Sequence, residues 1–100
     1  MRYYNRAGEQ IPVSEYLAEV EKNCNVAVDR VEGFGVSTVF MVIDRSYGNT
    51  GDPILFETMV FDDDLGALGH WTRHYSTEAE AVAGHNEIVA ALREGRGSDE

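Results

Sequence analysis

The sequence is poor in the residues and segments that mark secreted and membrane proteins. Its single cysteine, Cys24, cannot form an internal disulfide, so the fold does not depend on one. It contains no run of about 18 apolar residues, the length that a membrane-spanning helix needs. Residues 1–6 lead into no apolar segment of the kind found in secretion signals. We therefore expect a protein of the reducing cytoplasm that does not associate with a membrane.

Basic residues are also scarce. Eight lysines and arginines stand against 18 aspartates and glutamates, which gives a formal net charge of −10. Proteins that bind nucleic acid or anionic lipids need a basic surface, so the charge predicts no direct binding of either. The simplest interpretation of this charge is that it keeps the protein soluble. Attraction to a basic partner and acidic mimicry of nucleic acid are the alternatives.

What the chain does contain is typical of one small globular domain. It has 100 residues, of which 43% are hydrophobic and 10% aromatic, and this composition suffices for a packed core. No internal repeat or linker divides it. We predict a single domain over residues 1–95, followed by a flexible C-terminal tail over residues 96–100.

The spacing of apolar residues predicts two helices. Ser14 is a suitable N-cap for the first, over residues 14–24, and Thr77 with Glu80 forms a capping box for the second, which ends near Gly95. The apolar stripe of the first helix consists of Val13, Leu17, Val20 and Cys24. The apolar face of the second consists of Ala81, His85, Ile88 and Leu92, with Val82 and Val89 beside it.

Residues rich in β-branched and aromatic side chains predict the strands. They cover residues 26–31, 36–43, 54–61 and 70–75, and a short strand or hairpin precedes them within residues 3–11. The short connections favour antiparallel pairing. The predicted fold class is therefore α+β: a single domain with an antiparallel meander of about four strands and two helices, in the order (β)-α-β-β-β-β-α.

The two central strands, residues 36–43 and 54–61, are apolar on both faces, whereas a sheet with one face in water alternates apolar and polar residues. Two arrangements satisfy this pattern. Each helix covers one face, or both helices lie on one face and leave the other to another protein chain. We expect self-association through the second arrangement.

The candidate contacts for a ligand or partner are Asp44, Tyr47, Glu57, His74 and His85. Glu57 interrupts an apolar strand and Asp44 ends the preceding one. Two interpretations are open for each carboxyl group. It acts as an acid or base whose pKa is shifted by its surroundings, or, as we favour, it pairs with an arginine such as Arg30 or Arg73.

His85 lies at the centre of an apolar helix face. We interpret it as a core histidine bonded to a backbone carbonyl, to Tyr75 or to Glu57, and the alternative is a group at the mouth of a pocket. We expect both Glu57 and His85 to find their partners inside the protein.

No catalytic residue, cofactor or metal site is predicted. The chain lacks the nucleophile-elbow and nucleotide-binding motifs, and Cys24 belongs to a core stripe. His70 and His74 are about 13 Å apart along a strand, too far to share one ion. A weaker alternative joins His74 and His85 across the sheet–helix interface, with Asp44 or Glu57 as third ligand.

Three segments resemble a group of small uncharacterised proteins encoded by actinobacteriophages and related prophages. They are Val36-Ser37-Thr38-Val39-Phe40, Ile54-Leu55-Phe56-Glu57-Thr58-Met59-Val60-Phe61, and Tyr75-Ser76-Thr77-Glu78-Ala79-Glu80-Ala81 followed by Ala83-Gly84-His85. The resemblance runs over roughly residues 36–94. No activity is assigned to this group, so no catalytic residue is carried over. The chain departs from the group at Arg45, where a histidine is common, and at His74, which separates Arg73 from Tyr75.

The resemblance implies a viral context in the cytoplasm of a bacterial host. Our leading hypothesis is a small non-enzymatic phage-type accessory protein that binds a protein partner as a homodimer. The alternatives are a structural or assembly component of the virion, a small-molecule binder or hydrolase using Glu57, Asp44 and His85, and an acidic nucleic-acid mimic.

Overall fold

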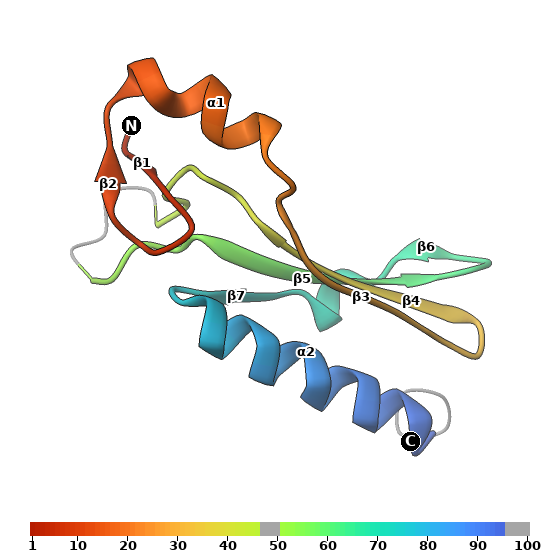
Figure 1. The fold of residues 1–100 in the computed structure, drawn as a ribbon. Coiled ribbons are helices and arrows are strands. Elements are labelled where there is room, and N and C mark those ends of the chain that lie inside the picture. Colours follow the sequence, from red (N-terminus) through yellow and green to blue (C-terminus); the bar gives the residue numbers. More distant parts are fainter. Residues whose placement is uncertain (47–50, 96–100) are drawn as a thin grey trace.

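The computed structural model describes residues 1–46 and 51–95 and has the α+β architecture that the sequence predicts (Figure 1). A small hairpin and a short helix precede a five-stranded sheet, and a long helix follows it. The elements in order are β1 (Tyr3–Tyr4), β2 (Gln10–Ile11), the 3-10 helix η1 (Val13–Glu15), α1 (Tyr16–Glu21), β3 (Asn25–Val31), β4 (Phe34–Phe40), β5 (Phe56–Asp62), β6 (Gly66–Ala67), the 3-10 helix η2 (Gly69–Trp71), β7 (Arg73–Tyr75) and α2 (Glu78–Arg93). The predicted tail, residues 96–100, lies outside the described residues.

The main sheet is antiparallel, but its path is not a simple meander. β3, β4 and β5 pair in sequence order, and β6 and β7 then both pair with the remaining edge of β5, one at each end. A tight turn after β5 makes this possible. In it the Asp62 carboxylate accepts hydrogen bonds from the backbone N–H groups of Asp64 and Leu65, at 2.8 and 3.0 Å. The strand predicted over residues 70–75 is accordingly confined to β7.

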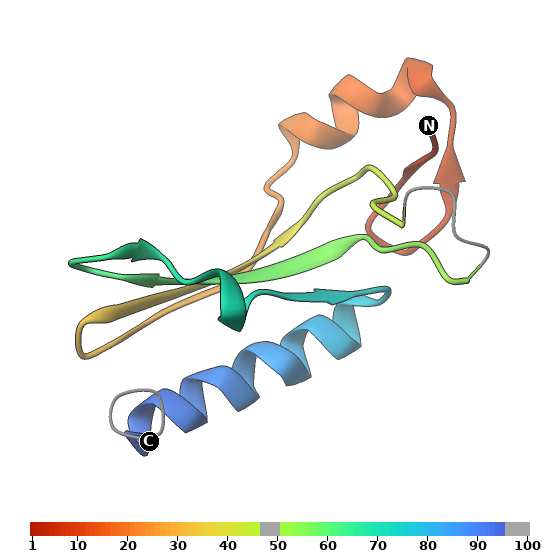
Figure 2. The same cartoon turned by 180° about the vertical axis from the view of Figure 1, so that it is seen from behind.

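Helix α2 covers one face of the sheet, on which it lies in both views (Figures 1 and 2). The predicted capping box is present: the Thr77 hydroxyl accepts the Glu80 N–H at 3.2 Å, and the Glu80 carboxylate accepts the Thr77 N–H at 3.1 Å. The predicted inward face of the helix is buried, whereas Val82 is exposed. Beneath it lie the buried sheet residues Val36, Thr38, Phe40, Phe56, Thr58 and Val60.

Helix α1 is shorter than predicted and buries a different side. The predicted stripe is largely in solvent, with exposed fractions of 66%, 69% and 42% for Val13, Leu17 and Val20. Tyr16 faces inward instead, with its ring centroid 4.9 Å from that of Tyr3. Ser14 does not cap the helix. The periodicity identified an apolar stripe, but this stripe is not the buried side, because the helix packs on the N-terminal hairpin through Tyr16 rather than on the sheet.

A tight turn after β4 attaches the N-terminal hairpin to the end of the sheet. Val42 has a φ of 66°, and the Ile43 N–H donates to the Met41 carbonyl at 2.7 Å, so the turn ends β4 before the predicted boundary. The Tyr4 N–H then donates to the Val42 carbonyl at 2.8 Å. Tyr4 and Val42 are both buried in the core as a result.

In the described part of the chain, no helix lies over the second face of the sheet (Figures 1 and 2). We call it the uncovered face and define it by Val28, Arg30, Ser37, Val39, Glu57, Met59, Phe61 and His74, which the register places on the side opposite α2. Val28 is 62% exposed and Phe61 41% exposed. The described residues leave one sheet face open, as in the second expected arrangement, but only α2 lies on the other face, because α1 packs on the N-terminal hairpin.

Candidate functional site

His85 belongs to a buried chain of hydrogen bonds between α2 and the sheet. Its Nδ1 lies 2.7 Å from the hydroxyl of Thr38, and its Nε2 lies 2.8 Å from a carboxylate oxygen of Asp29. The Thr38 hydroxyl also bonds to that of Thr58, which accepts a hydrogen bond of 3.1 Å from the Tyr75 hydroxyl. The prediction of a satisfied core histidine holds, but its partners are Asp29 and Thr38 rather than those expected.

The direction of each bond in this chain follows from the donor at its end. Because Tyr75 donates to Thr58, the Thr58 hydroxyl can donate to Thr38, and Thr38 can in turn donate to Nδ1 of His85. The imidazole proton then belongs on Nε2, where it is donated to the Asp29 carboxylate. In this arrangement every buried donor of the chain has an acceptor, which is what burial demands.

The order Asp29, His85, Thr38 matches that of an acid–base–nucleophile triad. Its setting does not suit catalysis, because Thr38 and His85 are both fully buried. A substrate carbonyl cannot approach the Thr38 hydroxyl without separating α2 from the sheet. The chain is therefore an internal support of the fold. This chain was not predicted from the sequence, and the signal that could have indicated it is the presence of one threonine in each of the two apolar strands, at positions that pair in the sheet.

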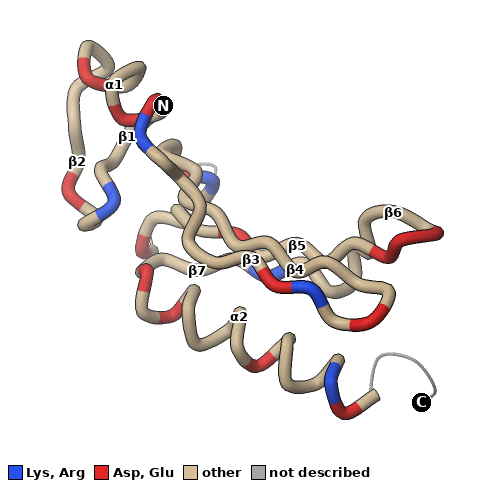
Figure 3. Tube along the Cα trace, turned by 45° about the vertical axis from the view of Figure 1, so that its right-hand side comes forward, with Lys and Arg blue, Asp and Glu red and all other residues tan. Residues whose placement is uncertain are grey.

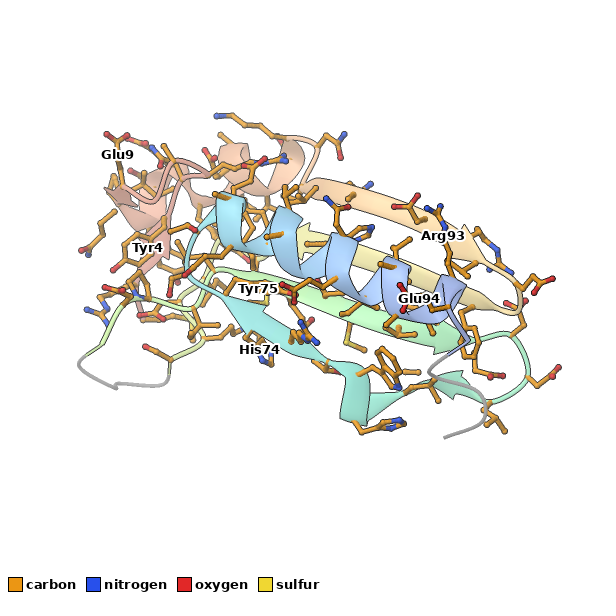
Figure 4. The ribbon with its side chains drawn as sticks, turned by 90° about the horizontal axis from the view of Figure 1, so that it is seen from below. Tyr4, Glu9, His74, Tyr75, Arg93 and Glu94 are labelled. Carbon is orange, nitrogen blue, oxygen red and sulfur yellow. The ribbon has the colours of Figure 1, made fainter. Side chains whose placement is uncertain are left out.

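Glu57 and His74 form a separate pair on the uncovered face. His74 Nε2 lies 3.0 Å from a Glu57 carboxylate oxygen, and the two side chains are 47% and 27% exposed. The arginine partners predicted for Glu57 are replaced by His74, which is its cross-strand neighbour in β7. Tyr75, labelled next to His74 in Figure 4, alternates to the side of α2.

This alternation also separates His74 from His85, which lie on opposite sides of the sheet, so the two-histidine metal site is wrong. Among residues 1–46 and 51–95, no group of three or more histidines, cysteines or carboxylates is placed to hold a metal ion. The hydrolase alternative requires one pocket that contains Glu57, Asp44 and His85. The structure places these three side chains apart, each with different partners.

A shallow pocket adjoins the Glu57–His74 pair at one end of the uncovered face. It has a volume of about 410 Å³ and is lined by Met41, Arg45, Ile54, Glu57 and His74. The lining combines an apolar part, from Met41 and Ile54, with charged and titratable groups. Such a pocket suits an apolar side chain or small group with polar neighbours. Tyr47, the remaining candidate contact, lies outside the described residues.

Asp44 ties three segments together. One carboxylate oxygen accepts the backbone N–H groups of Ser46 and Ile54, at 2.8 and 3.0 Å, and the other accepts the Arg2 guanidinium at 2.8 Å. Burial favours a higher pKa for this carboxyl, but these N–H donors and Arg2 outweigh it and hold the pKa below its ordinary value. Asp44 is thus a structural carboxylate rather than a catalytic one.

Replacing Asp44 with asparagine should lower the free energy of unfolding at pH 7 by about 1–2 kcal/mol, because an amide accepts these bonds less well than a carboxylate. A lowered pKa in the folded state gives stability above the ordinary aspartate pKa of 3.8, and this stability is lost as the pH falls through the folded pKa. Urea denaturation at pH 7 and pH 3 measures both quantities. Asp44→Asn and the parent should differ less at pH 3, and Asp52→Asn, at an exposed position of the same loop, is the control. A pH-independent difference would contradict this account.

Comparison with known proteins identifies no relative, since the chain matches no protein-family model, no curated protein and no solved structure. No helix in the described part of the chain combines the length and hydrophobicity needed to cross a bilayer.

Proposed function

We propose that the protein acts by binding protein, as a homodimer, through the uncovered face of its sheet. The observation that carries this proposal is the exposure of Val28 and Phe61 on a sheet face without a covering helix. Partly buried Val39 and Met59 lie beside them and extend the apolar surface. Exposed apolar surface of this kind is characteristic of protein–protein contacts.

The distribution of charge supports a protein partner over nucleic acid. Lysines and arginines are scattered over the described chain rather than clustered (Figure 3). Several of them are already engaged by carboxylates: Arg2 with Asp44, Arg6 with Glu78, Lys22 with Glu19, Arg30 with Asp63 and Arg73 with Glu87. On the uncovered face itself Arg30 pairs with Asp63 and Glu57 pairs with His74, so a chain of net charge −10 leaves no unpaired carboxylate among the residues that define this face. Such pairing reduces the repulsion of a second acidic chain.

The proposed setting is that of a phage-type accessory protein in the cytoplasm of a bacterial host. The support for it is the resemblance of residues 36–94 to small actinobacteriophage and prophage proteins. A binding role is consistent with a fold whose only triad-like arrangement in the described residues is closed to substrates.

Light scattering after size-exclusion chromatography at micromolar concentration should give about twice the chain mass of 11.1 kDa. Val28→Lys should shift the protein to the monomer mass, because it places an ammonium group in the proposed interface. The same measurement on Val82→Lys should still give a dimer, because Val82 is exposed on α2, away from the uncovered face.

Thermal melting of both variants checks that the substitutions leave the chain folded. The proposal fails if the parent protein is a monomer, or if Val28→Lys and Val82→Lys affect the mass equally.

A further inference from the structure

We infer that the outer edge of β3 binds an extended segment of a partner protein, which joins the sheet as an additional strand. The inference goes beyond the proposed dimer, because it concerns the edge of the sheet rather than its uncovered face. β3 is the last strand in the order of the sheet, and in the part of the chain that the structure describes no other element lies along its outer side (Figure 4). An open edge of this kind can pair with another extended chain.

The register of the β3–β4 hairpin determines which backbone groups face this edge. Val31 and Phe34 flank its two-residue turn and form a hydrogen-bonded pair. Bonding alternates along an antiparallel strand, so Asp29 also bonds to β4, whereas the N–H and C=O groups of Val28 and Arg30 point outward. These outward groups have no hydrogen-bond partner among the described residues. They are the donors and acceptors that an added strand requires.

The charged side chains of β3 do not block its edge, although charged residues commonly protect edge strands. The Arg30 guanidinium extends over β4 to Asp63, which follows β5, with an N–O distance of 2.7 Å. The Asp29 carboxylate bonds to Nε2 of His85, on the α2 side of the sheet, at 2.8 Å. Both charged groups are thus directed toward neighbouring elements rather than outward, and the adjacent Val28 is apolar and 62% exposed.

The edge is poorly suited to pairing with a second copy of itself. A symmetric antiparallel pair must bring outward-facing residues opposite each other, so its two-fold axis passes at Val28, Asp29 or Arg30. An axis at Asp29 or Arg30 places like charges directly opposite each other. An axis at Val28 pairs Arg30 with Val26, which lies in the bulge at the start of β3 and interrupts the ladder. We therefore assign the edge to a segment of a different protein.

The side chains beside the edge indicate the chemistry of this segment. On the uncovered face it would lie against Val28, which favours β-branched or other apolar residues. Asp29 and Arg30 have partners, whereas the exposed Glu32 in the following turn forms no ion pair with another described residue. The chain also has a net charge of −10. The expected segment is therefore extended and apolar, with basic rather than acidic residues at its ends.

Titration with a synthetic peptide, followed by nuclear magnetic resonance, tests the edge. The probe alternates valine and threonine, has a lysine at each end and is capped at both termini. It should shift the amide resonances of Val28 and Arg30 and slow their exchange with solvent, because both N–H groups become hydrogen-bonded. A control peptide with proline at two adjacent central positions lacks one N–H group on each of its edges, and it should not bind.

Two variants at Arg30 separate the backbone from the side chain. Arg30→Pro and Arg30→Ala both lose the ion pair with Asp63, but only proline also removes the outward N–H group, which β4 does not use. Arg30→Pro should bind the peptide roughly tenfold more weakly than Arg30→Ala, or not at all. Thermal melting checks that both variants are folded, and the two peptides test the parent protein independently of either variant.

Equal affinities of the two folded variants, equal binding of the two peptides, or shifts confined to Phe61 and its neighbours would overturn the inference. Slow exchange of the Val28 and Arg30 amides before any peptide is added would also overturn it, because the edge would then be paired with a second copy. Light scattering on the same samples reports dimerisation separately. A monomeric parent that binds the peptide at β3 would contradict the proposed dimer and support the assignment of the edge.

Discussion

Replacing His85 with alanine should lower the free energy of unfolding by about 3 kcal/mol. The substitution removes a fully buried ring from the interface of α2 with the sheet and leaves a cavity there. It also leaves the Thr38 hydroxyl without the acceptor that Nδ1 provides at 2.7 Å. Both losses arise at the same place, since the unpaired hydroxyl faces the cavity. Chemical denaturation at pH 7, with parent and variant at the same concentration, measures the difference.

Glu57→Ala is the matched comparison, since Glu57 also sits among apolar residues of a central strand. Its bond to His74 lies on the exposed side, so its removal should cost at most about 1 kcal/mol. Thr38→Val, which keeps the shape of the side chain but removes its hydroxyl, should fall between them at about 1–2 kcal/mol. Equal losses for His85→Ala and Glu57→Ala would contradict the division into a buried support and a surface pair.

The elements of the fold that local sequence determines were predictable. Thr77 and Glu80 specify the start of α2 by satisfying each other's backbone donors, and this is independent of the rest of the chain. The apolar residues of the central strands likewise predicted strand pairing, but they left open whether a helix or another chain covers the second face. The α+β class follows from these local signals, and the structure confirms it.

The contacts that depend on distant parts of the chain were not predictable. The side of α1 that is buried depends on the N-terminal hairpin, to which Tyr3 contributes the contact with Tyr16. The partner of His85 depends on the register of β3, which brings Asp29 to the α2 side of the sheet. The spacing of apolar residues along a helix or strand gives its periodicity, but it does not identify the element that packs against it. For α1 the error concerns which side is buried, whereas for α2 the buried face was predicted correctly and only the partners of His85 differ.

Gly84→Ala should destabilise the protein by about 2 kcal/mol, although glycine in a helix interior ordinarily costs about 1 kcal/mol relative to alanine. A Cβ at this position would clash with the Tyr75 side chain, at its hydroxyl oxygen and at Cε1 of its ring. The ring packs directly against the α2 backbone here, so it would have to move. The Tyr75 hydroxyl would then lose its bond to Thr58, and the chain that ends at His85 would lose its first donor. Thermal and chemical denaturation measure the loss.

The same substitution in a second background separates the steric cause from helix propensity. In Tyr75→Ala the obstacle is gone, so adding Gly84→Ala should be neutral or should raise stability by about 0.5–1 kcal/mol. Ala83→Gly, at the exposed neighbouring position of α2, should cost about 1 kcal/mol by propensity alone. The destabilisation caused by Gly84→Ala would therefore disappear or change sign in the second background, and this difference is specific to contact with the Tyr75 ring. An increase in stability in the parent protein would show that the ring does not need the space that glycine leaves.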